Sequence, residues 1–266
     1  MKTISFLMLI LVLSVSSCKK DDSSSNPVGN GSIILDFDHR ANGAAFSLGN
    51  NYANEAGEQL NFSLFDYYVS NFELIRTDGS VYTLPKDSCY FLIKSSDAST
   101  REVLLNNIPA GDYASVRFVI GVDSVKSVSP ASERVGVLDP AGEGADMYWS
   151  WNSGYIFVKA EGTSPQISSV NNMFKYHIGL FGGGVNGQAT TLNNLRQVTL
   201  SNASGDVGMV RSDATPEYHI MVDVMQLFKS PTTISVAANP TVMASPFSAN
   251  VANNYTDMFV LDHIHN

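Results

Sequence analysis

Short segments in which apolar and polar residues alternate recur along this chain, and they constrain its fold more than any other feature of the sequence. Between Ser32 and His39 every second residue falls on one face of an extended strand, because successive side chains of a strand point to opposite sides. The residues on that face are Ile33, Leu35, Phe37 and His39. No run keeps the period of an amphipathic helix for long, so the pattern predicts an all-β fold.

Further strand-like segments are separated by turns rich in Gly, Pro and Asn. They span residues 62–76, 89–94, 113–120, 155–161, 174–180, 196–201, 218–228 and 232–237. Helices should be minor, with a turn or two at residues 123–129 and 250–259, and residues 138–154 should form an ordered loop. Strands of this number and length predict a single antiparallel β-sandwich domain over residues 32–266.

The N-terminus predicts export and a lipid anchor. Lys2 precedes a short apolar run, and small residues then lead to Cys18, which is the order of a lipoprotein signal over residues 1–18. The alternative is an ordinary secretory signal with a chance cysteine. Residues 19–31 are rich in Ser and Asn and predict a flexible tether, and their Lys-Asp-Asp step resembles a surface-export signal. We expect attachment to the outer membrane through Cys18, on the periplasmic side or at the cell surface.

Charge and cysteine content exclude two classes of protein. The formal net charge is −9, and loss of Lys2 with the signal makes the mature chain more acidic, whereas nucleic-acid binding needs clustered Lys and Arg. The chain has two cysteines, so a lipidated Cys18 leaves Cys89 without a disulfide partner. Stability must therefore come from a hydrophobic core, in which Cys89 is expected as a small apolar residue.

Motifs for catalysis are absent from the sequence. It contains no Gly-x-Ser-x-Gly elbow and no His-Glu-x-x-His pair. Carboxylates such as Asp139, Glu143 and Asp146 are the residue type of a glycosidase, but loop carboxylates are usually solvated. We therefore expect a protein that is not an enzyme.

The five histidines, His39, His177, His219, His263 and His265, each lie in or beside a strand-like segment. His39 shares the apolar face of its strand and should point inward, where a lone histidine is usually a hydrogen-bonded core residue. His263 and His265 are two residues apart, so on a strand they point the same way and can hold one metal ion. A frayed C-terminal tail that binds metals incidentally is the alternative.

Both tryptophans, Trp149 and Trp151, fall in an aromatic segment at residues 147–162. The segment can serve as a sugar-stacking platform, as a core plug under a loop, or as part of a soft-metal pocket. The sequence leaves these three interpretations open.

Two motifs together resemble the MbnP-like copper-binding proteins, a family named for the methanobactin-associated periplasmic member. One is Tyr-Tyr-x-Ser-Asn at residues 67–71, and the other is Trp-x-Trp-x-x-Gly-Tyr at residues 149–155. Supporting segments run through most of the domain, at residues 37–39, 121–123, 176–179 and 218–223.

The resemblance implies a secreted β-sandwich that binds copper, as Cu(I) or Cu(II), with His39, His177 and His219 as the ligand candidates that match the motifs. It also implies a partner dihaem enzyme of the peroxidase type, which converts a tryptophan to kynurenine; Trp149 and Trp151 are the candidates here. Phe37 stands where some relatives have tryptophan beside the first histidine. Imidazole ligands suit zinc as well as copper, so zinc is the alternative ion.

These inferences predict a copper-binding envelope lipoprotein that acquires, carries or sequesters copper. A surface or glycan-binding module is the first alternative, which an exposed tryptophan pair remote from all histidines would favour. A structural lipoprotein with a relict site is the second, which histidines too far apart to share an ion would favour.

Overall fold

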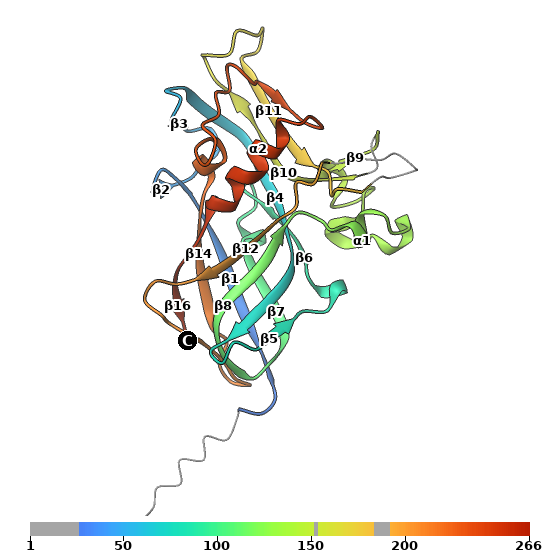
Figure 1. The fold of residues 1–266 in the computed structure, drawn as a ribbon, viewed down its shortest axis with the longest axis vertical. Helices are drawn as coiled ribbons and strands as arrows, with labels where there is room; N and C mark the ends of the chain where they lie inside the picture. Colours follow the sequence, from blue (N-terminus) through green and yellow to red (C-terminus); the bar gives the residue numbers. More distant parts are fainter. Residues whose placement is uncertain (1–26, 152–153, 184–191) are drawn as a thin grey trace, which may run out of the picture.

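The computed structural model describes residues 27–151, 154–183 and 192–266. The predicted signal, Cys18 and most of the predicted tether therefore lie outside the described residues. In the described part, two β-sheets pack face to face, with strand β1 (Asn30–Ala41) starting at the end of the molecule where the chain enters (Figure 1). Within the same part of the chain, no helix is both long enough and apolar enough to span a bilayer.

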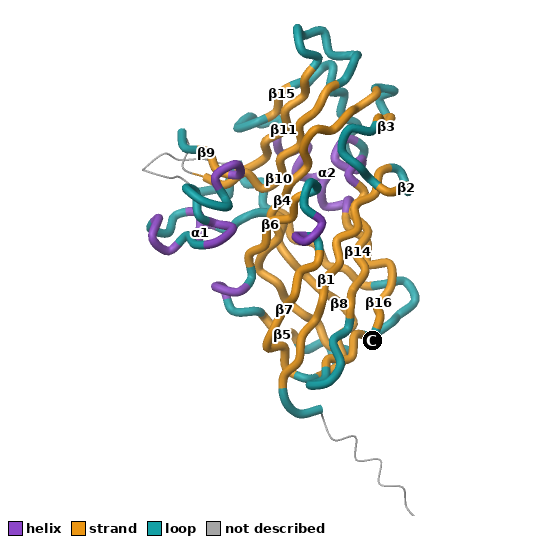
Figure 2. Tube along the Cα trace, turned by 180° about the vertical axis from the view of Figure 1, so that it is seen from behind, coloured by secondary structure: helices purple, strands orange, loops and turns teal. Residues whose placement is uncertain are grey.

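The smaller sheet has strand order β16-β14-β1-β2, with β7 also paired to β1 (Figure 2). Buried and outward side chains alternate along β1, and its buried residues face the other sheet. Strands β1 and β14 run parallel, whereas the other pairs in this sheet are antiparallel. The remaining strands of this sheet are β2 (Ala44–Ala45), β7 (Glu102–Pro109), β14 (Glu217–Asp223) and β16 (Phe259–His265).

The larger sheet is built around the long strand β4, and its main order is β12-β8-β4-β10-β11-β15. Pairing is antiparallel except for β11 with β15. Its principal strands are β4 (Gln59–Arg76), β8 (Gly111–Ile120), β10 (Gly154–Thr163), β11 (Met173–Gly179), β12 (Arg196–Ser201) and β15 (Thr241–Val242). Shorter strands pair along it: β3 (Asn51–Ala53), β5 (Val81–Thr83), β6 (Tyr90–Lys94), β9 (Tyr148–Trp149) and β13 (Gly208–Val210).

The main core fills the space between the sheets and is rich in aromatic rings. Phe37 of β1 meets Phe118 of β8 and Phe259 of β16 edge to face, at centroid distances of 5.9 and 6.3 Å. Cys89 is a buried free thiol, and burial raises its pKa. The predicted all-β sandwich is confirmed, and the two parallel pairs are the departure from a purely antiparallel one.

Helices are short, as the sequence predicts. Among the described residues, the α-helices are α1 (Ser124–Ser127) and α2 (Ser248–Asn254). The 3-10 turns lie at Lys86–Ser88, Ala98–Thr100, Ala131–Glu133, Gly136–Leu138, Ala145–Met147, Val224–Phe228 and Tyr255–Met258.

A second, smaller core lies on the outer face of the larger sheet, under the segment that carries α1 and β9 (Figure 1). Tyr68 and Tyr155 reach out of the sheet and donate hydrogen bonds to the carbonyls of Val137 and Leu138, at 2.5 and 2.6 Å. Trp149 is buried in this core. The described residues 138–151 of the predicted ordered loop are therefore anchored by their own apolar contacts and by these hydrogen bonds.

The Tyr-Tyr-x-Ser-Asn motif holds this segment in place. Ser70 is buried and donates a hydrogen bond to the Gly121 carbonyl at 2.7 Å. Asn71 has a positive φ, at a break in the β4–β8 register, and donates to Asp123 at 2.7 Å. Asp123 also accepts from the Lys126 backbone N–H and so caps α1. The motif residues thus connect β4 to the end of β8.

The predicted strand at residues 232–237 is wrong, because the Glu58 carboxylate occupies the amides that a neighbouring strand would need. Glu58 is buried and accepts hydrogen bonds from the backbone N–H groups of Val236 and Ala237, at 2.8 and 2.9 Å. It also accepts from Ser235 Oγ at 2.6 Å and Asn54 Nδ2 at 2.7 Å. The segment is a turn fastened to Glu58 instead of a strand in a ladder.

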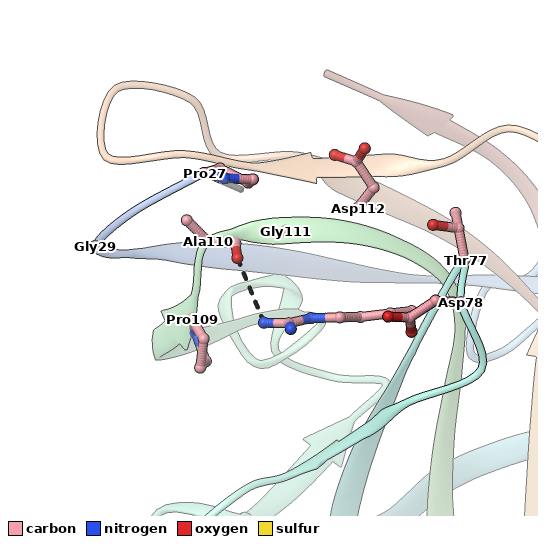
Figure 3. A pocket seen from close by; sticks show the side chains of 9 residues that line it. Pro27, Gly29, Thr77, Asp78, Pro109, Ala110, Gly111 and Asp112 are labelled. Carbon is pink, nitrogen blue, oxygen red and sulfur yellow. Dashed lines mark hydrogen bonds between the residues drawn. The ribbon is translucent and has the colours of Figure 1, made fainter. Parts of the chain in front are cut away.

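A cavity of about 340 Å³ opens where the chain enters the sandwich (Figure 3). Arg76, Asp78 and Asp112 line it, and Arg76 donates a hydrogen bond to the Ala110 carbonyl at 3.3 Å. The cavity contains none of the residues that the sequence predicts as site residues.

Candidate metal centre

Three side chains with metal-binding atoms meet on the outer face of the smaller sheet. His219 lies in the middle of β14, opposite His263 of β16 on one side and Asp36 of β1 on the other. The neighbours Tyr218 and Ile220 are buried in the core, so strand alternation directs His219 away from it.

A β-bulge adds the carboxylate to this group. His219 pairs with His263 and Ile220 pairs with Leu261, so Asp262 is an extra residue in β16. An extra residue interrupts the alternation of a strand and re-aims a side chain. Leu261 and Ile264 are buried, whereas Asp262 and His263 both lie on the outer side with His219.

The ligand atoms of His219, Asp262 and His263 lie within 4.8 Å of one another. Asp262 Oδ2 is 2.8 Å from His263 Nδ1 and 3.7 Å from His219 Nδ1. The two imidazole rings stack with centroids 4.7 Å apart. His219 Nδ1 is buried and has no hydrogen-bond partner, so it is a lone nitrogen turned towards a carboxylate.

Carboxylates on the other side of the His219 ring determine which ring nitrogen carries the proton. They therefore determine whether the nitrogen that faces Asp262 has a free lone pair. His219 Nε2 lies 3.3 Å from Asp38 Oδ2 and 3.9 Å from Asp36 Oδ2, which favours the ring proton at Nε2. Arg40 Nε donates to Asp38 at 2.6 Å and holds that carboxylate in place. Burial raises the pKa of Asp36, and the hydrogen bond from His263 lowers the pKa of Asp262. This is the carboxylate–histidine arrangement that orients metal ligands.

His265 extends the group along β16, as its spacing from His263 predicts. The Nε2 atoms of His263 and His265 are 2.9 Å apart. Two nitrogens on one Cu or Zn ion, each bonded at about 2.0–2.1 Å, are separated by roughly 2.9–3.4 Å for angles near 90–110°. The pair therefore already has the spacing of a chelate.

His39 lies on the opposite face of the same sheet, inside the main core. It is buried between Phe46, Phe65 and Tyr67, and its Nε2 is 3.1 Å from the Tyr67 hydroxyl. Burial lowers its pKa to about 4, so His39 is neutral at pH 7. The inward orientation predicted from the strand pattern is confirmed, and it separates His39 from the outward His219.

His177 lies on the other sheet. It belongs to β11, opposite Lys159 of β10, and its Nε2 is 2.6 Å from Glu161 Oε1. The three ligand candidates implied by the family resemblance, His39, His177 and His219, therefore do not meet in one site. Of the five histidines, His219, His263 and His265 converge, which does not match the dispersed arrangement expected of a relict site.

The two tryptophans differ in exposure. Trp149 is 5% exposed and packs against Gly179, whereas Trp151 is 64% exposed. Their ring centroids are 5.3 Å apart at an angle of 39°. A sugar-stacking platform needs exposed ring faces, and one tryptophan of the pair offers them.

Sequence reasoning missed Asp36 and Arg40, which lie on β1 beside the cluster. Asp36, Asp38 and Arg40 alternate with buried residues, so the period-2 pattern does place them outward. It does not show that β1 lies parallel to β14 beside His219.

The fold and the cluster together define a β-sandwich with a candidate metal centre on one outer face. A family model for MbnP matches residues 30–244, and the chain belongs to this family. Its structure is similar to that of MbnP from Methylosinus trichosporium, at 18% sequence identity and a TM-score of 0.55, over 89% of this chain and 99% of that chain. A search of curated proteins gave no match. The family match ends before β16, so Asp262, His263 and His265 lie outside it.

The burial of His39 predicts a pH-dependent loss of stability. The folded state takes up a proton on His39 at about pH 4 and the unfolded chain at about 6.5, so the unfolded state binds more protons between these values. Stability should therefore fall as the pH drops from about 6.5 to 4, by about 3 kcal/mol from this residue. Urea unfolding of His39→Ala should lack this part of the pH dependence. A wild-type pH profile of stability in His39→Ala would contradict this assignment.

Proposed function

We propose that this protein binds copper through His219, Asp262 and His263, with His265 beside them, and acts in copper acquisition, carriage or sequestration at the cell envelope. The observation that carries the proposal is His219 Nδ1, a buried nitrogen without a hydrogen bond that faces Asp262 at 3.7 Å. An unpaired buried polar atom costs about 1–3 kcal/mol. A cation held between this nitrogen, Asp262 and His263 would remove that cost.

The donor set supports copper as the ion. Imidazole nitrogens with one carboxylate suit Cu(II) and Zn(II), and the two facing imidazoles of His263 and His265 suit Cu(I) as well. Zinc has a similar ligand preference, and membership of the MbnP family, which is associated with copper, favours copper over zinc. We propose a binding role instead of catalysis.

The direct test is a metal titration of the chain without residues 1–18 and without affinity-tag histidines. Cu(I), Cu(II) and Zn(II) are each titrated against competing chelators, with a free peptide of residues 259–266 as the control. We expect one copper per chain, bound at least about 100-fold more tightly than by the peptide, because the folded chain adds His219 and fixes Asp262. Affinity no better than that of the peptide would refute a folded copper site.

We further propose that the predicted lipid at Cys18 attaches the protein, and with it the metal centre, to a membrane. One lipidated terminus with a flexible tether attaches a domain to a membrane surface without crossing it. Replacing Cys18 with alanine should move the protein from the membrane fraction to the soluble fraction of the cell envelope. Continued membrane association of the variant would contradict the anchor.

The proposal also includes a partner enzyme that oxidises tryptophan, as the family resemblance implies. Trp151 is the better candidate of the two tryptophans, because its ring is exposed whereas Trp149 is covered. Peptide mass spectrometry of protein purified from its native host tests this point. Kynurenine at Trp151 would support the partner, and two unmodified tryptophans in copper-loaded protein would argue against it.

A further inference from the structure

His263 has a different neighbour at each of its two ring nitrogens. Nδ1 is 2.8 Å from Asp262 Oδ2, on the side of His219. Nε2 is 2.9 Å from His265 Nε2, on the side of the C-terminus. The His263 ring therefore lies between two groups of metal-binding atoms.

The position of one proton decides which group can use His263. A neutral imidazole has one N–H and one lone pair. With the proton on Nδ1, His263 donates to Asp262, and its Nε2 lone pair faces His265. With the proton on Nε2, His263 donates to His265, and its Nδ1 lone pair faces Asp262 and His219. In the first tautomer both short contacts can be hydrogen bonds. In the second, the Nδ1 lone pair faces the acceptor-only Asp262 carboxylate at 2.8 Å, an arrangement that a bound cation would stabilise.

We propose that the bound metal ion exchanges between two positions that share the His263 ring. The outer position lies between the Nε2 atoms of His263 and His265. The inner position lies between His219 Nδ1, Asp262 Oδ2 and His263 Nδ1. This inference rests on the proposed function, because it requires that the cluster binds a metal ion.

The exchange conserves protons and electrons. When the ion moves inward, its bonds to His263 Nε2 and His265 break, and bonds to His263 Nδ1, Asp262 and His219 form. The His263 proton leaves Nδ1 for water and Nε2 gains a proton from water, so the ring stays neutral and the ion keeps its oxidation state. Both positions together would require a ring without either proton. We therefore expect one ion per chain.

The two positions differ in their exposure to solvent. His265 is exposed, and the side chains of Asp262 and His263 are 45% and 39% exposed. The His219 side chain is 17% exposed and lies against the β1 carboxylates. The outer position is therefore the one that an incoming chelator or a receiving protein reaches, and the inner position is the one that retains the ion.

Nitrogen-15 NMR of histidine-labelled protein, with Cu(I) as the probe, tests the exchange. The chemical shift of each ring nitrogen distinguishes a metal-bound atom from a protonated one. In His265→Ala we expect copper on His263 Nδ1, because only the inner position remains. In His219→Ala we expect copper on His263 Nε2, because the outer pair is then the stronger chelate. The same His263 nitrogen bound in both variants, or two ions per wild-type chain, would overturn the proposal.

Release kinetics give a second readout. His265→Ala should slow transfer of Cu(I) to a competing chelator roughly tenfold, because the outer position is lost. His177→Ala is the control and should release copper at the wild-type rate. An unchanged rate in His265→Ala would count against the exchange even if copper binds. Absence of Cu(I) binding by the wild-type chain would instead refute the proposed function itself, and the exchange with it.

Discussion

Replacing His263 with alanine is expected to weaken copper binding by about 100-fold or more, the largest effect of any single histidine. Loss of a residue that only orients a ligand typically costs 10–100-fold, and His263 is itself a ligand in both proposed positions. Its ring stacks on His219 and lies within 2.9 Å of both Asp262 and His265. Competition titration with Cu(I) measures the change.

His177→Ala is the matched control for this experiment. Like His263, His177 lies on an outward strand face and contacts a carboxylate, Glu161, at 2.6 Å. It belongs to the other sheet, so its replacement should leave the copper affinity within about twofold of the wild type, a change of less than about 0.5 kcal/mol. Equal losses from His177→Ala and His263→Ala would show that the cluster on β14 and β16 is not the copper site.

The second large effect is expected at Glu58, which lies far in sequence from the proposed metal ligands of β14 and β16. Glu58→Ala removes the acceptor of the Val236 and Ala237 amides and of Asn54, and it leaves buried donors without partners. Hydrogen bonds to charged groups contribute about 1.5–3 kcal/mol each, and they are not additive. We expect the free energy of unfolding to fall by about 4 kcal/mol in urea denaturation.

The pH dependence of this contribution has a definite sign. Burial raises the pKa of Glu58, but the hydrogen bonds from Ser235, Ala237 and Asn54 outweigh burial and leave the pKa below its ordinary value. The stabilisation is therefore present above the ordinary glutamate pKa and is lost as the pH falls through the folded value.

Glu55→Ala is the control, because Glu55 forms an exposed ion pair with Lys229, and such pairs contribute about 0–1 kcal/mol. Equal costs for Glu58→Ala and Glu55→Ala would refute the role of the buried carboxylate.

Much of the fold could be predicted from the sequence because the alternation of buried and exposed residues is a local property. Residues 32–39 and 196–201 are strands in the structure, and the inward orientation of His39 follows from the same pattern. Residues 232–237 have the composition of a strand, but the Glu58 carboxylate, distant in sequence, binds their amides. A contact between residues so far apart leaves no local signal.

The candidate site likewise has a part that the local sequence predicts and a part that depends on long-range contacts. The pairing of His263 and His265 follows from their spacing, because side chains two residues apart on a strand point to the same face. The parallel contact of β1 with β14, which brings Asp36 and Asp38 beside His219, depends on the path of the whole chain. Several motif residues of the family, including Ser70, Asn71 and Trp149, support the fold through buried contacts and lie outside the metal cluster.

The bulge at Asp262 has a consequence for how such a centre arises. Without Asp262, β16 would return to regular alternation: Leu261 and Ile264 would still face the core, and His263 and His265 would still face outward. Insertion of a single codon is therefore enough to add a carboxylate to a strand that already carries two histidines. The core keeps its side chains, and the strand gains a third ligand in one evolutionary step.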